Sequence, residues 1–150
     1  MRKFILLLCV CLMGCSTVTV DINDHYKKPD CAISVIDERP DEKMVSGPFI
    51  TSLDITPSIK DFLSFKICNS SKIRNFIKEN NLFVRIKDLK YTSTDYTIFV
   101  ISGSTQIGSN IYDIQSMGKG YFPGLPSNRL KALIMKSSDD FVNKIEEKLK

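Results

Sequence analysis

The spacing of the apolar residues changes its period twice along this chain, and these changes limit the folds that it can adopt. In residues 57–80 and again in 128–149, apolar residues recur at helical spacing, which predicts one amphipathic helix in each segment. Between these segments, apolar and polar residues alternate, which is typical of strands. With a short strand expected at residues 32–37, the order is strand, helix, three strands, helix. The pattern predicts an α+β fold, in which an antiparallel sheet of about four strands carries both helices on one face.

Local signals refine these elements. Thr56 and Pro57 are typical of a helix start, and the apolar stripe that follows continues through Ser70, which favours one long helix rather than two. Three strands are expected at 82–91, 96–102 and 111–117, joined by turn residues into a meander. The alternation slips by one residue at Asp88, which predicts a β-bulge.

The strand at 96–102 is apolar on both faces. Ile98 and Val100 point one way, and Phe99 and Ile101 point the other way. Each helix has a single apolar stripe and can bury only one side, so we expect Phe99 and Ile101 to lie on the uncovered face of the sheet and to contact a partner. In the alternative, residues 18–22 or 49–53 cover that face.

A second candidate for partner contact is the proline-stiffened loop that begins at Tyr121 and Phe122. Two aromatic side chains in a stiff loop would form a contact patch at low entropic cost if they were exposed. In the alternative, which we favour, Phe122 and Leu125 close the end of the core under the last helix.

The N-terminus has the features of a secretory signal. Arg2 and Lys3 precede ten apolar residues, a stretch that fits a signal and is too short to span a membrane. Residues 12–15, Leu-Met-Gly-Cys, resemble the bacterial lipobox. That resemblance implies cleavage before Cys15, diacylglycerol on the Cys15 thiol and an acyl group on its amine, whereas the alternative is a plain cleaved signal. We therefore predict a signal peptide at 1–14, a lipidated tether at 15–30 and a single α+β periplasmic domain at 31–150.

Two details follow from this division. The Val18, Val20 and Ile22 alternation leaves open that part of 15–30 is an edge strand rather than a tether. Ser16 is not the aspartate that resembles an inner-membrane retention signal, so we expect the protein on the periplasmic face of the outer membrane.

Two cysteines remain in the expected domain, Cys31 and Cys68, and a disulfide between them is possible because disulfides persist in the periplasm. Helical spacing puts Cys68 opposite the apolar stripe of its helix, so Cys31 would have to cross the outer side of that helix. Two unpaired thiols are the alternative.

The sequence offers little that resembles a catalytic site. His25, the one histidine, lies in the expected tether, and the spacings of Cys and His do not match a metal site. The acidic loop at 37–42 is interpreted as a solvated turn rather than a carboxylate pair for catalysis. The net charge of +4 is too small for a dedicated nucleic-acid binder. We predict no enzymatic activity, no metal, no cofactor and no nucleic-acid partner.

The order of elements, the lipobox and the segment Val35-Ile36-Asp37-Glu38-Arg39-Pro40 together resemble the small outer-membrane lipoproteins of the YajG type and, more loosely, lipoprotein auxiliaries of envelope transport systems. The resemblance implies an anchored periplasmic domain without a known catalytic role. We expect an interaction or assembly accessory with an envelope protein as its partner. The alternative is a lipid carrier, or transport auxiliary, that holds a lipid between sheet and helices.

Overall fold

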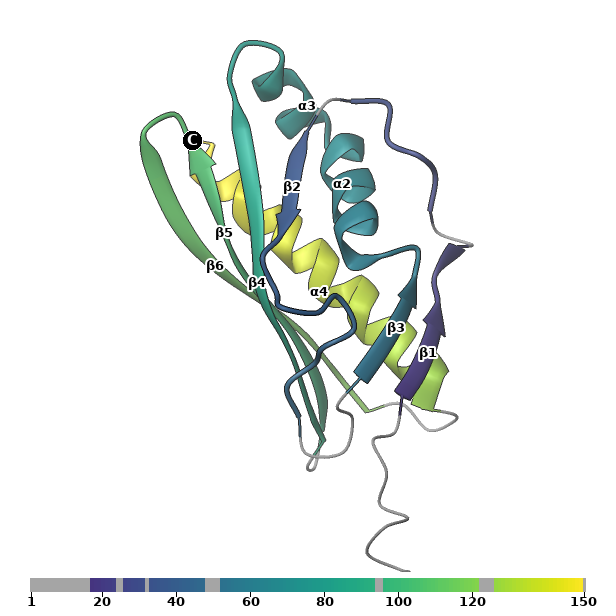
Figure 1. Cartoon of the computed structure of the whole chain (residues 1–150). Helices are drawn as coiled ribbons and strands as arrows, with labels where there is room; N and C mark the ends of the chain where they lie inside the picture. The colour runs from purple at the N-terminus through teal and green to yellow at the C-terminus, as the bar shows by residue number, and fades with distance from the viewer. Residues whose placement is uncertain are drawn as a thin grey trace, which may run out of the picture.

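The computed structural model describes residues 17–23, 26–31, 33–47, 52–93, 96–121 and 126–149, and an α+β fold with an antiparallel sheet is confirmed (Figure 1). These residues contain more strands than expected, in two sheets rather than one. The elements are β1 (Thr17–Asp21), β2 (Ser34–Asp37), β3 (Ser52–Thr56), α2 (Ile59–Asn69), α3 (Ser71–Ile77), β4 (Leu82–Ser93), β5 (Thr97–Ile107), β6 (Asn110–Gly120) and α4 (Pro126–Lys148).

The main sheet has the strand order β2-β4-β5-β6. The meander of β4, β5 and β6 is antiparallel, with a register shift between Ile86 and Asp88 that confirms the predicted bulge. The edge strand β2 runs parallel to β4, which differs from the expected all-antiparallel sheet. The reason is the connection: the chain passes through β3, α2 and α3 before it returns as β4, and a crossover of this kind joins parallel strands.

The second sheet pairs β1 with β3 in parallel over five residues. Residues 17–22 of the predicted tether therefore belong to the folded domain, as in the edge-strand alternative. Val20 and Ile22 are buried in the core, and the Ile22 N–H donates to the Thr56 carbonyl at 2.8 Å. Burial of these two apolar residues makes β1 part of the folded domain rather than a spacer.

The helix expected at 57–80 is two helices. Ser70 has an extended backbone, and its hydroxyl accepts a hydrogen bond from the Ile73 N–H at 3.1 Å, so it ends α2 and caps α3. The same hydroxyl donates to Glu146 of α4 at 2.6 Å, which fixes the break against the other helix. At the other end, Ser58 rather than Thr56 is the N-cap, since its hydroxyl accepts from the Asp61 N–H at 3.2 Å.

Both long helices lie on the same face of the main sheet, with α4 across β5 and β6 and α2 beside β2 (Figure 1). Three phenylalanines with no exposed surface, Phe62, Phe99 and Phe141, come from α2, β5 and α4 and meet in one core. A side chain at Gly118 would place its Cβ 2.1 Å from the Leu133 carbonyl oxygen. Glycine at this position therefore allows the backbone of α4 to approach β6 closely.

Candidate functional site

Neither α2 nor α4 covers the second side of the main sheet, and we call this side the open face. It is built from alternate residues of the strands, because side chains in a strand point to opposite faces. Its exposed apolar side chains are Ile36 (42% exposed), Phe83 (38%), Ile111 (60%) and Met117 (49%). The register places Phe83 and Ile111 on either side of Gln106, so side chains from β4 and β6 lie near each other across β5.

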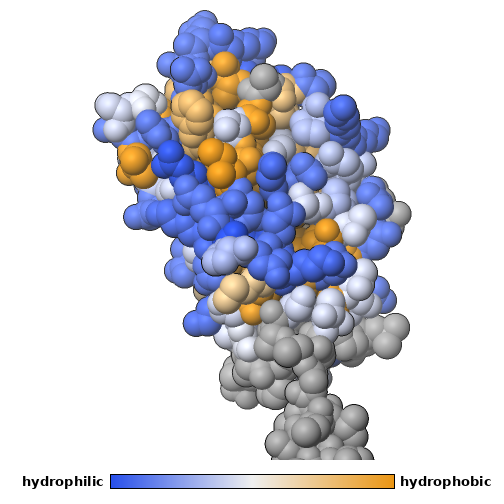
Figure 2. Space-filling model, in the orientation of Figure 1, coloured by the Kyte–Doolittle hydropathy of each residue, from blue (hydrophilic) through white to orange (hydrophobic). Residues whose placement is uncertain are grey.

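Charged pairs divide the open face. Lys87 contacts Asp113 at 2.8 Å, and Arg85 contacts Glu38 at 3.2 Å. These pairs separate an apolar corner formed by Ile36, Phe83 and Ile111 from Met117, which lies further along β6. Figure 2 shows the division, with hydrophobic surface at the upper ends of the strands and a hydrophilic band below it. The open face thus combines an apolar corner with solvated ion pairs.

The prediction that Phe99 and Ile101 lie on an uncovered face is wrong. Both are fully buried, on the face that the helices cover. They share that face with Gly103, whose absent side chain leaves room for the ring of Phe141 in α4. Ile98 and Val100 point to the open face instead. Of the loop residues, Tyr121 is 78% exposed, whereas Phe122 lies outside the described residues, as does Cys15.

Cys31 and Cys68 are joined in a disulfide, with their Cα atoms 5.7 Å apart. Cys68 is 1% exposed, so the side of the helix that carries it is covered rather than solvated. The chain before Cys31 crosses that side of α2, and the ring of Tyr26 packs edge-on against Phe65 with 5.6 Å between centroids. Arg74 strengthens this arrangement by donating to the Cys68 carbonyl at 2.9 Å.

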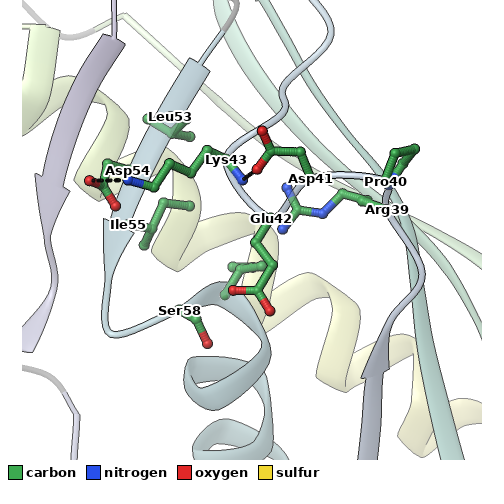
Figure 3. A pocket seen from close by; sticks show the side chains of 10 residues that line it. Arg39, Pro40, Asp41, Glu42, Lys43, Leu53, Asp54, Ile55 and Ser58 are labelled. Atoms are coloured by element: carbon green, nitrogen blue, oxygen red, sulfur yellow. Dashed lines mark hydrogen bonds and ion pairs between the residues drawn. The ribbon is translucent and has the colours of Figure 1, made fainter.

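A cavity of about 540 Å³, lined by both charged and apolar side chains, lies between the loop after β2, strand β3 and the start of α2 (Figure 3). Its wall includes part of the acidic loop at 37–42, and the prediction that this loop is a solvated turn is wrong for two residues. The side chains of Asp37 and Arg39 are 4% exposed and form a two-pronged ion pair, with Nε and Nη2 of Arg39 2.8 and 2.5 Å from the carboxylate. The Arg39 Nη1 donates to the Met44 carbonyl at 2.9 Å. The pair therefore holds the loop folded back on itself.

The chemistry available in this cavity is limited. All three guanidinium nitrogens of Arg39 already donate to Asp37 or Met44, and Lys43 pairs with Asp54 at 3.0 Å. In the part of the chain that the structure describes, no three His, Cys, Asp or Glu side chains gather as metal ligands would. His25, the one histidine of the sequence, lies outside the described residues. Nor does any helix in the described ranges combine the length and apolar character that a membrane span requires.

Sequence reasoning missed the residues of the apolar corner, although one signal was present. Phe83 occupies a polar phase of the alternation in β4, between the core residues Leu82 and Val84. A large apolar side chain in the solvent phase of a strand marks a surface that differs from an ordinary solvated face.

Comparison with known proteins does not assign the chain to a class. No protein-family model and no curated protein sequence matches it. A solved structure described as "Crystal structure of uncharacterized protein" superposes with a TM-score of 0.47 and 6% sequence identity, over 90% of this chain and 100% of the other.

Proposed function

We propose that this protein is a lipid-anchored periplasmic accessory of the bacterial envelope that binds a protein partner through the open face of its sheet. The observation that carries the proposal is the apolar corner, where Ile36, Phe83 and Ile111 are each exposed by more than a third although they belong to regular strands. Large apolar side chains that gather at an exposed surface of a small domain mark a candidate binding site. Flanking ion pairs such as Arg85–Glu38 would set the specificity of the contact.

The anchor rests on the sequence. Residues 12–15 resemble a lipobox, which supports lipidation of Cys15, and Ser16 favours the outer membrane. Several acyl chains on one residue would hold the protein on a bilayer. Replacement of Cys15 with Ala, followed by fractionation of the envelope, tests this part. We expect an unprocessed precursor and no mature membrane-bound form, whereas a processed, membrane-bound C15A protein would contradict the assignment.

The alternative, a lipid carrier, has less support. A carried acyl chain would need room between sheet and helices, where Phe62, Phe99 and Phe141 are fully buried and pack in one core. Mass spectrometry of the purified protein tests the alternative directly, because a retained lipid other than the covalent anchor would favour the carrier.

Photo-crosslinking in intact envelopes tests the open face. A photoreactive residue at Phe83 or Ile111 should give discrete adducts with an envelope protein, and a matched control at Glu147, exposed on α4, should not. A second substitution, Ile36→Asp, should reduce the adducts from position 83 without loss of folding, because a charge in the apolar corner opposes burial by a partner. Equal adducts from positions 83, 111 and 147 would contradict a specific docking face.

A further inference from the structure

The start of β1 lies very close in sequence to the expected lipid anchor. Only Ser16 separates Cys15 from Thr17, the first residue of β1. Two residue steps span at most about 7 Å. Because β1 is paired with β3 along its whole length and Val20 is buried, this strand cannot peel away without disrupting the core. The folded domain itself, rather than a flexible segment, therefore begins at the membrane surface.

The end of the domain that contains Thr17 also contains the ends of other elements (Figure 1). Strand β4 ends there, β5 begins there, β6 ends there and α4 begins there. The register pairs Thr97 with Gly120, so Tyr96 and Tyr121 are the next residues outward on these two neighbouring strands. The first turns of α4 lie beside β1, since Ser127 and Asn128 line a small cavity together with Thr19. We call this surface the anchor end.

The anchor end presents side chains that suit a lipid headgroup layer. Tyr121 is 78% exposed and Tyr96 is 50% exposed, more than most large apolar side chains of the described chain. The Lys119 ammonium lies over the Tyr96 ring, 4.2 Å from its centroid. Tyrosine favours the membrane–water interface because its ring is apolar and its hydroxyl is polar. Lysine beside it would approach anionic headgroups.

We propose that the anchor end rests in the headgroup layer of the bilayer that holds Cys15, with Tyr96, Tyr121 and Lys119 in contact with lipid headgroups. This inference rests on the proposed lipidation of Cys15. The short spacing to β1 brings this end to the bilayer, and the exposed tyrosines and lysine hold it in a fixed orientation. In this orientation the strands of the main sheet run away from the membrane. The open face is then roughly perpendicular to the bilayer surface and does not lie against it.

The orientation also places the proposed docking corner. From Gly120 at the anchor end, β6 runs to Ile111, nine residues away. At roughly 3.4 Å per residue, Ile111 stands about 30 Å from the headgroups. The apolar corner is thus presented to the periplasm, and the lipid surface and the protein partner use opposite ends of the same strands.

Tryptophan fluorescence in vesicles tests the proposal. The chain has no tryptophan, so Tyr121→Trp gives a single reporter at the anchor end and Ile111→Trp gives a matched control at the other end of β6. The processed, lipidated protein is placed in phosphatidylethanolamine–phosphatidylglycerol vesicles whose lipids are brominated near the headgroup end of the acyl chains. We expect bromine to remove more than about half of the emission of the tryptophan at 121, because an aromatic side chain at the membrane–water interface lies close to the brominated lipid. The emission of the tryptophan at 111 should stay nearly unchanged.

A spacer variant tests the role of the short connection. Twelve Gly and Ser residues inserted between Ser16 and Thr17 would give a mean reach of about 20 Å. We expect vesicle binding to persist while quenching of the tryptophan at 121 falls to the level of the control. Tyr96→Trp repeats the measurement should Tyr121→Trp fail to fold.

The outcomes separate the two proposals. A protein that does not float with vesicles, and whose mass lacks acyl groups, would contradict the anchor at Cys15. A protein that floats but shows equal quenching at positions 121 and 111, whether strong or absent, would overturn the orientation and leave the anchor intact. Unchanged quenching after insertion of the spacer would overturn the claim that the spacing brings the anchor end to the bilayer.

Discussion

Replacement of Arg39 with Ala should strongly destabilise this protein, although the residue lies in a loop. Arg39 makes a two-pronged contact with Asp37, and both side chains are 4% exposed. Its Nη1 also donates to the Met44 carbonyl, which anchors the far side of the loop. The alanine variant would leave the Asp37 carboxylate buried without its cation.

The expected loss follows from that burial. Removal of one partner of a buried ion pair costs about 3–5 kcal/mol, mostly because the remaining charge stays desolvated. Since the total stability of a domain is about 5–15 kcal/mol, the loss is a large part of it. For a domain of this size, it corresponds to a fall in Tm of roughly 10–20 °C. Arg39→Lys should recover little of the loss, because an ammonium group cannot reproduce the planar two-pronged contact.

Urea unfolding followed by circular dichroism measures the loss. The matched control is Lys43→Ala, which breaks the exposed Lys43–Asp54 pair nearby and should cost less than about 1 kcal/mol. The double variant Asp37→Val/Arg39→Met should be more stable than Arg39→Ala, since it removes both charges together. If Arg39→Ala costs no more than Lys43→Ala, the ion pair does not stabilise the loop and the reasoning from burial is refuted.

Three further predictions concern the core. Replacement of both Cys31 and Cys68 by Ser should lower the free energy of unfolding by about 3–4 kcal/mol, because the bridge closes a loop with a sequence separation of 37. Reduction of the parent protein should lower its urea midpoint by a matching amount. Gly118→Ala should cost about 1–3 kcal/mol in thermal unfolding by pushing α4 off the sheet, whereas Gly108→Asn, in open space at a φ of 60°, should cost less than about 1 kcal/mol. Phe99→Ala should cost about 3–5 kcal/mol, and unchanged stability would contradict its place in the core.

The parts of the fold that were predicted correctly depend on local periodicity. The α+β class follows from the change between helical and strand spacing, and the bulge between Ile86 and Asp88 follows from the slip in alternation. Both signals lie within a few residues of each other in the chain. Pairings between distant segments leave no such signal, so the parallel contacts of β1 with β3 and of β2 with β4 were not predicted.

The break at Ser70 shows the same limit. The apolar stripe keeps its phase from α2 into α3, so helical spacing alone favours a single helix. The extended backbone of Ser70 separates the two helices, and the Ser70 hydroxyl, which caps α3, also donates to Glu146, a residue 76 positions away. The local sign of the break in the sequence is Ser70 itself, because a serine inside an apolar stripe can cap a new helix.

The error in β5 has a different cause, and it changed the candidate site. Four successive residues from Ile98 to Ile101 are apolar, so alternation cannot say which pair faces the helices. The later residues of β5 that point the same way as Phe99 and Ile101 show which side faces the helices. Gly103 is small enough to admit Phe141, and Thr105 is buried with its hydroxyl bonded to the Phe83 carbonyl at 3.3 Å. Ser102 and Gln106 alternate with these residues along β5 and therefore lie on the open face, together with Ile98 and Val100.

The anchor end and the apolar corner lie at opposite ends of the same strands, and this placement connects the two proposals. If the anchor end rests on the bilayer as proposed, the length of β6 limits the height of Ile111 above it, because the strand is paired along its length and cannot shorten or tilt independently of the sheet. A spacer before Thr17 should therefore change where the corner can reach in the envelope without changing its intrinsic affinity for a partner. We expect the spacer variant to give altered crosslinks from position 83 in intact envelopes, whereas binding to the identified partner in detergent solution stays as in the parent. Altered binding in solution would instead mean that β1 supports the open face directly, and that the two ends of the sheet do not act independently.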